Sequence, residues 1–279
     1  MELVKILGTG NAMVTKCYNT CFTISKDSEH LLVDTGGGNT ILTNLEKLDI
    51  AINEIHHVFI SHRHNDHISG IVWIIRAVAQ QINNGKYEGN LIIYCHRNNI
   101  EAIKTLTSIL LDEKFTKCIG TRILFSEIHN NCTVTILDWD VVFFDIKSKK
   151  QLQFGFTTVL KNGKTLTFLG DEPYKDALLE YANNVDYLFH EAFCLYSEVD
   201  FFKPYEKHHA TVKDACETAS KLNVKNLVMF HTEDKNILNR KKLYTDEGKE
   251  FFAGNILVPD DLDIINIVNF KLSYTINKI

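Results

Sequence analysis

Short apolar runs alternate with turn residues and with helical patterns along the whole of this 279-residue chain. Apolar and β-branched runs bounded by Gly, Asn or Asp predict strands, whereas a period near 3.6 residues predicts helices. The expected strands are 4–7, 31–33, 58–60, 91–95, 133–137, 141–144, 154–160, 166–169, 187–189, 227–230, 264–268 and 271–276. The expected helices are 71–82, 99–111, 176–181 and 212–222, the last with Thr211 as its N-cap. This alternation predicts an α/β fold, and the lack of any Pro/Gly/Ser-rich linker predicts one domain over 1–279.

A histidine-rich segment follows the apolar run at 58–60. It reads Ser61-His62-Arg63-His64-Asn65-Asp66-His67, so three imidazoles and one carboxylate fall within six positions. Surface turns favour Gly, Asn and Asp rather than histidine, whereas imidazole and carboxylate are common ligands of zinc and related ions. The segment therefore predicts metal ligands at the end of a strand: His62, His64, Asp66 and His67.

Two more strands are followed by candidate ligands. Asp171 comes after the strand at 166–169, and His231 comes directly after the strand at 227–230. Asp171 alone could equally cap a helix that starts near Pro173. Together with His231 and the histidine-rich segment, it favours a metal site built from several strand ends.

Composition limits the classes of partner. The net charge of −5, from 30 basic and 35 acidic residues, argues against a broad polyanion-binding surface. Lys147-Ser148-Lys149-Lys150 is the main basic cluster near the candidate ligands, and its ordinary interpretation is a solvated loop. No apolar stretch approaches the ~20 residues that span a bilayer, and the N-terminus indicates a strand rather than a signal peptide. Seven cysteines, an odd number, indicate reduced thiols and a cytoplasmic location.

The ordered motifs resemble the metallo-β-lactamase superfamily. Five features match in order: Asp34-Thr35-Gly36-Gly37, His62-x-His64-x-Asp66-His67, Gly170-Asp171, His190-Glu191-Ala192 and the late His231. The chain is most similar to the ribonuclease Z-like branch, through His190-Glu191-Ala192-Phe193 and His209-Ala210-Thr211. The resemblance implies a four-layer αββα sandwich with a site for one or two metal ions.

The resemblance also implies a role for each candidate residue. One Zn²⁺ would be held by His62 and His64, and a second by Asp66, His67 and His231, with Asp171 as the bridge. Mn²⁺ or Fe²⁺ could take the place of zinc in such a donor set. Asp66 would also orient the attacking water. His209, with Glu191 behind it, would protonate the leaving oxygen.

Two departures from the branch are visible. Lys147 stands where relatives supply a further ligating histidine, so the ion at His62 and His64 is expected to be weak or absent, with the Lys147 ammonium replacing its charge. The interval from Lys147 to Asp171 is also too short for the Gly-rich arm with which ribonuclease Z enzymes hold tRNA.

These features predict a cytoplasmic, metal-dependent hydrolase, most simply a phosphodiesterase with a small or nucleotide-like substrate and no membrane partner. A tRNA 3′-processing endoribonuclease is one alternative, which the missing arm and the negative net charge disfavour. A non-catalytic member of the fold that binds a metal or ligand is the other, supported by Lys147. Members of the branch that the chain resembles are commonly dimers, so a homodimer is one expectation, and the sequence leaves the oligomeric state open.

Overall fold

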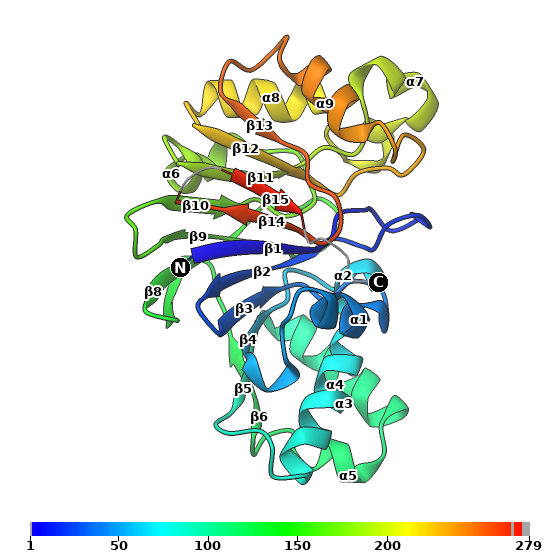
Figure 1. The fold of residues 1–279 in the computed structure, drawn as a ribbon, viewed down its shortest axis with the longest axis vertical. Coiled ribbons are helices and arrows are strands. Elements are labelled where there is room, and N and C mark those ends of the chain that lie inside the picture. The colour runs from blue at the N-terminus through cyan, green and yellow to red at the C-terminus, as the bar shows by residue number, and fades with distance from the viewer. Residues whose placement is uncertain (1, 269–270, 275–279) are drawn as a thin grey trace. The chain divides into compact units, whose positions relative to one another are not determined.

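The computed structural model describes residues 2–268 and 271–274, which form two compact units (Figure 1). Of the described residues, unit 1 comprises 2–8, 18–129, 261–268 and 271–274, and unit 2 comprises Thr9–Cys17 and Asn130–Asp260. Each unit contains one mixed sheet with its own helices and its own apolar core. The single domain expected over 1–279 stays a prediction.

The sheet of unit 1 has the strand order β15-β14-β1-β2-β3-β4-β5-β6. Its strands are β1 (Glu2–Gly8), β2 (Cys21–Lys26), β3 (Glu29–Val33), β4 (Ile55–Phe59), β5 (Leu91–Cys95), β6 (Ile123–Glu127), β14 (Asp263–Asn266) and β15 (Lys271–Tyr274). The strands β3 to β6 run parallel, and the other pairs are antiparallel. The helices of this unit are α1 (Thr40–Lys47), α2 (Asn65–Ile68), α3 (Ile71–Asn83), α4 (Arg97–Leu110), α5 (Glu113–Thr116) and a 3₁₀ turn at Ile52–Glu54.

Helix α3 carries the apolar face that its sequence predicts. Ile71, Ile74, Ile75 and Val78 recur at helical spacing, and all are fully buried in the core of unit 1. The helix ends at Asn83, just before Gly85, which adopts a positive φ of 66° that ends the helical turn. This helix begins four residues after His67, and its Trp73 and Ile74 N–H groups donate to Gly70 O, which ties the histidine-rich segment to a buried helix.

The sheet of unit 2 has the strand order β13-β12-β11-β10-β9-β8-β7. Its strands are β7 (Cys132–Ile136), β8 (Trp139–Asp145), β9 (Phe154–Val159), β10 (Thr165–Phe168), β11 (Tyr187–Glu191), β12 (Asn226–Phe230) and β13 (Asn255–Leu257). The strands β10 to β13 run parallel, whereas β7 to β10 form an antiparallel meander. The helices are α6 (Leu179–Ala182), α7 (Val199–Phe202), α8 (Val212–Lys221), α9 (Arg240–Gly248) and 3₁₀ turns at Asp176–Leu178, Tyr196–Glu198 and Pro204–Lys207.

Helix α8 begins where its cap predicts. The Thr211 hydroxyl accepts a hydrogen bond from the Asp214 backbone N–H, and the Asp214 carboxylate accepts one from the Thr211 backbone N–H at 2.8 Å. This reciprocal pair satisfies two N–H groups that have no partner within the helix. The buried face of α8, including Val212 and Ala215, then packs on β11 and β12. The helix thereby fixes the segment that carries His209 just before it.

Most of the expected elements are present with shifted ends. The helix expected at 99–111 starts earlier, at Arg97, and the one expected at 176–181 is divided into a 3₁₀ turn and α6. The strand expected at 271–276 is seen to Tyr274, and its last two positions lie outside the described residues. The helices and strands that were not expected are β2, β6, β13, α1, α2, α5, α7 and α9. Across the described residues, no helix is long and apolar enough to cross a membrane.

Candidate metal centre and catalytic residues

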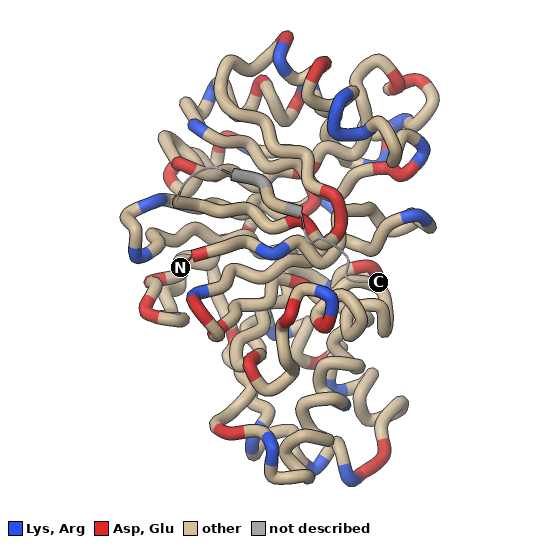
Figure 2. The backbone as a smooth tube through the Cα atoms, viewed as in Figure 1, with Lys and Arg blue, Asp and Glu red and all other residues tan. Residues whose placement is uncertain are grey.

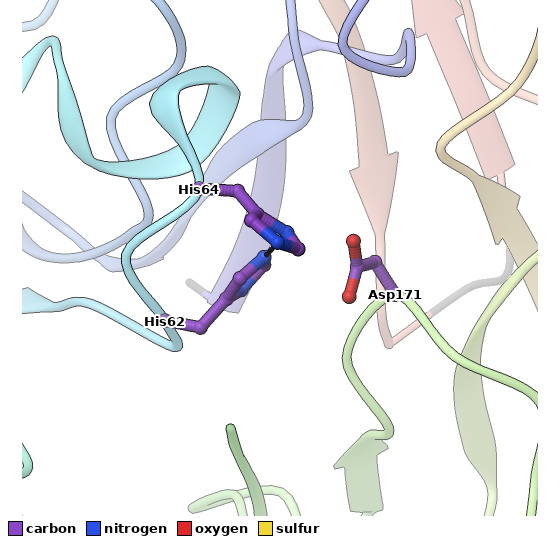
Figure 3. A group of neighbouring side chains, drawn as sticks. All are labelled: His62, His64 and Asp171. Atoms are coloured by element: carbon purple, nitrogen blue, oxygen red, sulfur yellow. Dashed lines mark hydrogen bonds between the residues drawn. The ribbon is translucent and has the colours of Figure 1, made fainter. Parts of the chain in front are cut away.

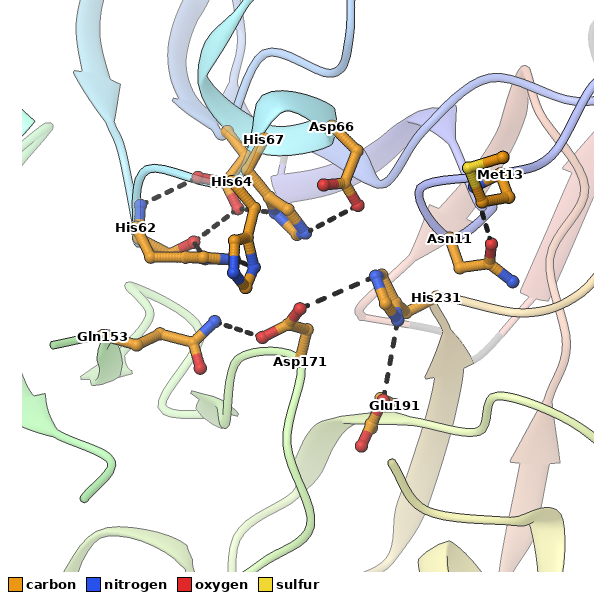
Figure 4. A network of polar contacts seen from close by, with 12 residues as sticks. Asn11, Met13, His62, His64, Asp66, His67, Gln153, Asp171, Glu191 and His231 are labelled. Carbon is orange, nitrogen blue, oxygen red and sulfur yellow. Dashed lines mark hydrogen bonds and ion pairs between the residues drawn. The ribbon is translucent and has the colours of Figure 1, made fainter. Parts of the chain in front are cut away.

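In unit 1, the candidate ligands follow β4 at the carboxyl edge of the parallel strands. His62 and His64 lie in the connection after β4, and Asp66 and His67 lie in the short helix α2. Strand β3 is the parallel neighbour of β4, so its following residue, Asp34, emerges at the same edge. The fold thus brings the four predicted ligands of this segment together (Figure 4), with the Asp34 carboxylate bonded to His67.

Asp34 organises this group through three hydrogen bonds. Its carboxylate accepts from the Ser61 backbone N–H at 2.8 Å and from the Ser61 hydroxyl at 2.7 Å, and it bonds His67 Nδ1 at 2.8 Å. The Ser61 hydroxyl also lies 2.9 Å from His62 Nδ1. Because both Nδ1 atoms are engaged in this way, the Nε2 atoms of the two rings point toward the centre of the group. A carboxylate behind a histidine in this way is the usual support of a metal-ligating imidazole.

Asp34→Asn is expected to weaken metal binding about 10- to 100-fold, the usual effect of losing the carboxylate behind a ligating histidine. The amide replaces one of two accepting oxygens by a donor, so it cannot hold both Ser61 and His67. Asp49→Asn is the matched control, because Asp49 is an exposed residue of the same unit with a φ of 53°, against 54° for Asp34. Competition against a chelating dye measures the affinity. Equal affinities in the two variants would contradict the role given to Asp34.

The imidazoles of this group lie close together. His62 Nε2 is 2.8 Å from His64 Nδ1, with the two ring centroids 4.6 Å apart (Figure 3). His67 Nε2 lies 3.4 Å from the Asp66 carboxylate. Burial lowers the pKa of His67, but the nearby Asp66 and Asp34 carboxylates outweigh it and hold that pKa well above its usual range. A metal ion bound there would replace the proton, since a ligating imidazole must be neutral.

Gly70 allows the histidine-rich segment to fold back on the end of β3. Its N–H donates to Gly36 O at 2.9 Å, and a Cβ at this position would lie 2.0 Å from Thr35 O. Thr35 in turn bonds the His67 carbonyl through its N–H and its hydroxyl, each at 2.9 Å. The close backbone approach at Gly70 therefore contributes to the position of His67.

Gly70→Ala is expected to lower the free energy of unfolding by about 1–3 kcal/mol, the usual cost of forcing an extra carbon into a packed site. The added carbon meets a backbone oxygen, which cannot move aside as a flexible side chain could. Gly38→Ala is the control, because a Cβ there meets no heavy atom within 4 Å. Urea denaturation of both variants measures the change. A Gly70→Ala protein as stable as the control would show that this contact is not tight.

In unit 2, three parallel strands end at one edge with a polar residue each. Asp171 follows β10, Glu191 ends β11 and His231 follows β12, and these strands are hydrogen-bonded neighbours. His231 Nε2 lies 3.7 Å from the Asp171 carboxylate, and His231 Nδ1 lies 3.5 Å from Glu191 Oε2 (Figure 4). The 3₁₀ turn after Asp171 has Lys175 as its N-cap, so Asp171 does not cap it. All three side chains are buried.

His209 joins this group from the segment before α8. Its Nδ1 lies 2.6 Å from Glu191 Oε2, and the other oxygen of Glu191 accepts from the Ala210 N–H at 2.8 Å. Burial raises the pKa of Glu191 to about 8, although hydrogen bonding and proximity to His231 oppose this rise. Glu191, His209 and His231 each offer a ligand atom within 4.8 Å of the others. Unit 2 therefore contains both the predicted acid pair and a group that could hold a cation.

The loop from β8 to β9 differs from expectation. Lys147 Nζ lies 3.1 Å from the Asp145 carboxylate, so its charge is already paired, which speaks against its replacing the charge of an ion. The residue of this loop that reaches Asp171 is Gln153, whose side-chain amide donates to the Asp171 carboxylate. The basic cluster is only in part a solvated loop: Lys147 and Lys149 are exposed, whereas Ser148 and Lys150 make specific contacts with Glu172 and His209.

Arg240 supports the segment around His231. This fully buried residue donates to the Thr232 hydroxyl at 2.5 Å and to the Thr9 hydroxyl at 3.1 Å, and it pairs with Asp260 at 2.9 Å. His231 itself has a positive φ of 57°, a conformation that costs free energy for a residue with a Cβ. Arg240 and Asp34 were not among the predicted site residues. The buried arginine has no local sequence signal, whereas Asp34 has the same strand-then-acid pattern as Asp171.

Relatives and solved structures place this geometry in a known class. Ribonuclease Z of Nanoarchaeum equitans is 24% identical over 317 residues, which cover 99% of this chain and 97% of that protein. The metallo-β-lactamase fold protein YhfI from Bacillus subtilis superposes with a TM-score of 0.78 at 18% identity, over 94% of this chain and 98% of YhfI. A diphosphatase of the PhnP family has a TM-score of 0.73 at 16% identity, over 98% of this chain and 100% of the other.

The fold and the histidine-rich segment define the class: this is a metal-dependent hydrolase of the ribonuclease Z-like metallo-β-lactamase group. The predicted α/β sandwich class and the predicted resemblance are both confirmed. More specifically, the sequence matches the family of the anti-Pycsar protein Apyc1 over residues 1–251. The chain belongs to that family.

Proposed function

We propose that this protein is a phosphodiesterase that uses metal-activated water on a small, nucleotide-like substrate. The observation that carries the proposal is the buried pair of His209 and Glu191, 2.6 Å apart, at the edge that also presents Asp171 and His231. A nearly buried histidine whose Nδ1 is held by a carboxylate is equipped to deliver a proton from Nε2. Neither a simple binding protein nor a structural protein needs such a pair.

The metal ligands are proposed from the resemblance. His62 and His64 would hold one ion, Asp66, His67 and His231 would hold a second, and Asp171 would be shared by both. The chemistry of the donors fits, because His62 and His67 are buried and their Nδ1 atoms are held by Ser61 and Asp34. When bound, two such cations supply a water of lowered pKa and stabilise charge on a phosphoryl oxygen. The histidine-rich set favours Zn²⁺, and Mn²⁺ or Fe²⁺ are the alternatives that elemental analysis would separate.

The chain's own residues then have distinct tasks. Asp66 orients the attacking water and accepts its proton. His209 protonates the leaving oxygen through Nε2, while Glu191 holds the ring by Nδ1 and stabilises its charged form. Two residues of opposite function, a base and an acid, are needed for phosphodiester cleavage because one oxygen gains a bond while another leaves.

Hydrolysis of bis(p-nitrophenyl) phosphate tests the proposal, followed by a panel of cyclic mononucleotides and dinucleotides. We expect turnover that disappears on chelation and returns when Zn²⁺ or Mn²⁺ is added back. Turnover that persists after complete removal of metal would refute the mechanism. Full metal content without hydrolysis of any ester, thioester, lactone or phosphodiester would instead favour the non-catalytic alternative.

A tRNA 3′-processing endoribonuclease is the second candidate, favoured by the full-length similarity to ribonuclease Z. The interval from Lys147 to Asp171 contains only a loop and the β9–β10 hairpin, so it holds no Gly-rich arm. Basic and acidic positions are interspersed along both units (Figure 2). A tRNA enzyme would shift a precursor tRNA in a gel at low salt and release it as salt rises. No shift at low salt would exclude this candidate.

The proposal includes a cytoplasmic location and leaves the assembly of the protein to be measured. None of the seven cysteines, all of which lie among the described residues, is in a disulfide, in line with the cytoplasmic location expected from the sequence. The homodimer implied by the resemblance stays a prediction, and sedimentation velocity would check it.

A further inference from the structure

The loop between β8 and β9 is built to present one lysine. Its ends are joined by the Ile146 N–H, which donates to Gln153 O at 3.1 Å. The Ser148 hydroxyl donates to Glu172 at 2.5 Å, and the same hydroxyl accepts the Lys150 N–H at 3.1 Å. Glu172 is buried and pairs with Lys175 at 2.8 Å. The loop therefore has a fixed conformation, anchored on the residue next to Asp171.

The three lysines of this loop have different surroundings. Lys147 pairs with Asp145 at 3.1 Å, and Lys149 is exposed. Lys150 is half-buried, and its ammonium donates to His209 Nε2 at 3.1 Å. Among the described residues, no carboxylate lies within ion-pair distance of Lys150. Lys150 is therefore a positive charge beside the acid pair that no acidic side chain of the described chain neutralises.

We propose that Lys150 binds a nonbridging oxygen of the scissile phosphate. The inference rests on the proposed phosphodiesterase function and adds the residue that holds the substrate's charge. His209 Nε2 must come within hydrogen-bond reach of the leaving oxygen, and Lys150 Nζ lies one hydrogen bond from Nε2. An ammonium at this position reaches another oxygen of the same phosphoryl group, for which it is a strong charge-assisted donor.

The contact seen between Lys150 and His209 is then the arrangement without substrate. When the substrate binds, the Lys150 ammonium leaves the neutral imidazole of His209 and donates to an anionic phosphate oxygen instead. The anionic oxygen is the stronger acceptor. The exchange releases Nε2 to face the leaving oxygen. Lys150 thus acts on binding and on the orientation of His209, with no bond made or broken at the lysine itself.

The experiment compares Lys150→Met with Lys149→Met in metal-loaded protein. Both variants lose one positive charge from the same loop, so they share any long-range effect on anions. Calorimetry with inorganic phosphate is expected to give a Kd at least about 10-fold weaker for Lys150→Met, and a change under about 2-fold for Lys149→Met. Lys150→Arg, which keeps the charge, is expected to bind phosphate within a few-fold of the wild type.

Steady-state kinetics with bis(p-nitrophenyl) phosphate supplies the second measurement. We expect the KM of Lys150→Met to rise by a factor similar to that of the phosphate Kd, with thermal midpoints equal to those of Lys149→Met. Unchanged phosphate binding and KM in a folded Lys150→Met protein overturn the inference while the phosphodiesterase proposal stands. If no protein turns over substrate but Lys150→Met alone loses phosphate, the phosphodiesterase proposal fails and the anion site remains.

Discussion

His67→Ala is expected to lose nearly all phosphodiester hydrolysis, a fall of about a thousand-fold in kcat/KM, or ~4 kcal/mol of transition-state stabilisation. His67 is fully buried and its Nδ1 is fixed by Asp34 at 2.8 Å, so its Nε2 is the best oriented donor of unit 1. The proposed ligand set gives it the more complete of the two sites. Elemental analysis after gel filtration should therefore show loss of the tightly held ion.

His64→Ala is the informative comparison. The site proposed for His62 and His64 lacks the further histidine of related enzymes, and Lys147 is turned to Asp145 instead. This variant is expected to keep the tight ion and lose the weak one, so its activity should recover in part with added metal. His129→Ala, an exposed histidine of the same unit, controls for loss of an imidazole. Full metal content and full activity in His67→Ala would remove the basis of the assignment.

Glu191→Gln is expected to lower kcat by about 100- to 10,000-fold, the range in which a positioned acid and its supporting carboxylate contribute. The substitution keeps the shape of the side chain but removes the charge that favours a proton on His209. Burial raises the pKa of Glu191 to about 8 and so opposes the charged carboxylate, whereas the hydrogen bonds that it accepts favour it. The neutral amide should therefore leave the thermal midpoint within a few degrees of the wild type.

A double variant makes this prediction sharper. If Glu191 acts only through His209, then Glu191→Gln combined with His209→Ala should be no slower than His209→Ala alone. Glu247→Gln is the control in the same unit, because Glu247 accepts backbone N–H groups of Tyr196 and Ser197 far along the chain. If the two substitutions instead multiply their separate reductions of kcat in the double variant, Glu191 has a separate role, such as holding a cation with His231.

The sequence predicted those features that depend on residues close together in the chain. The histidine-rich segment and the strand-then-acid positions could be found because each ligand directly follows an apolar run that becomes a parallel strand. Helices α3 and α8 were found because their buried faces recur at helical spacing. In contrast, the buried positions of α9 recur at helical spacing but are Arg240, Tyr244 and Gly248, which do not form an apolar face in the sequence. The burial of Arg240 is explained by partners such as Thr9, far along the chain.

The basic cluster was interpreted as a solvated loop because its local sequence does not reveal its tertiary contacts. Nothing in Lys147-Ser148-Lys149-Lys150 distinguishes one lysine from another, and a solvated loop is the common outcome for such a run. What separates them is tertiary: Glu172 lies beneath Ser148, and His209 approaches from a segment 59 positions away. The contact of Gln153 with Asp171 could not be predicted from the sequence either, because it depends on the pairing of strands β9 and β10.

The single carboxylate of Asp34 has a consequence for metal uptake. One of its oxygens accepts from Ser61 and also bonds His67, while Ser61 in turn bonds His62. The two proposed ions therefore draw on histidines whose ring orientations are set by a shared acceptor, and filling one position stiffens the other. Filling the tighter position should then strengthen binding at the weaker one, and this coupling should be lost when Ser61 is replaced by alanine.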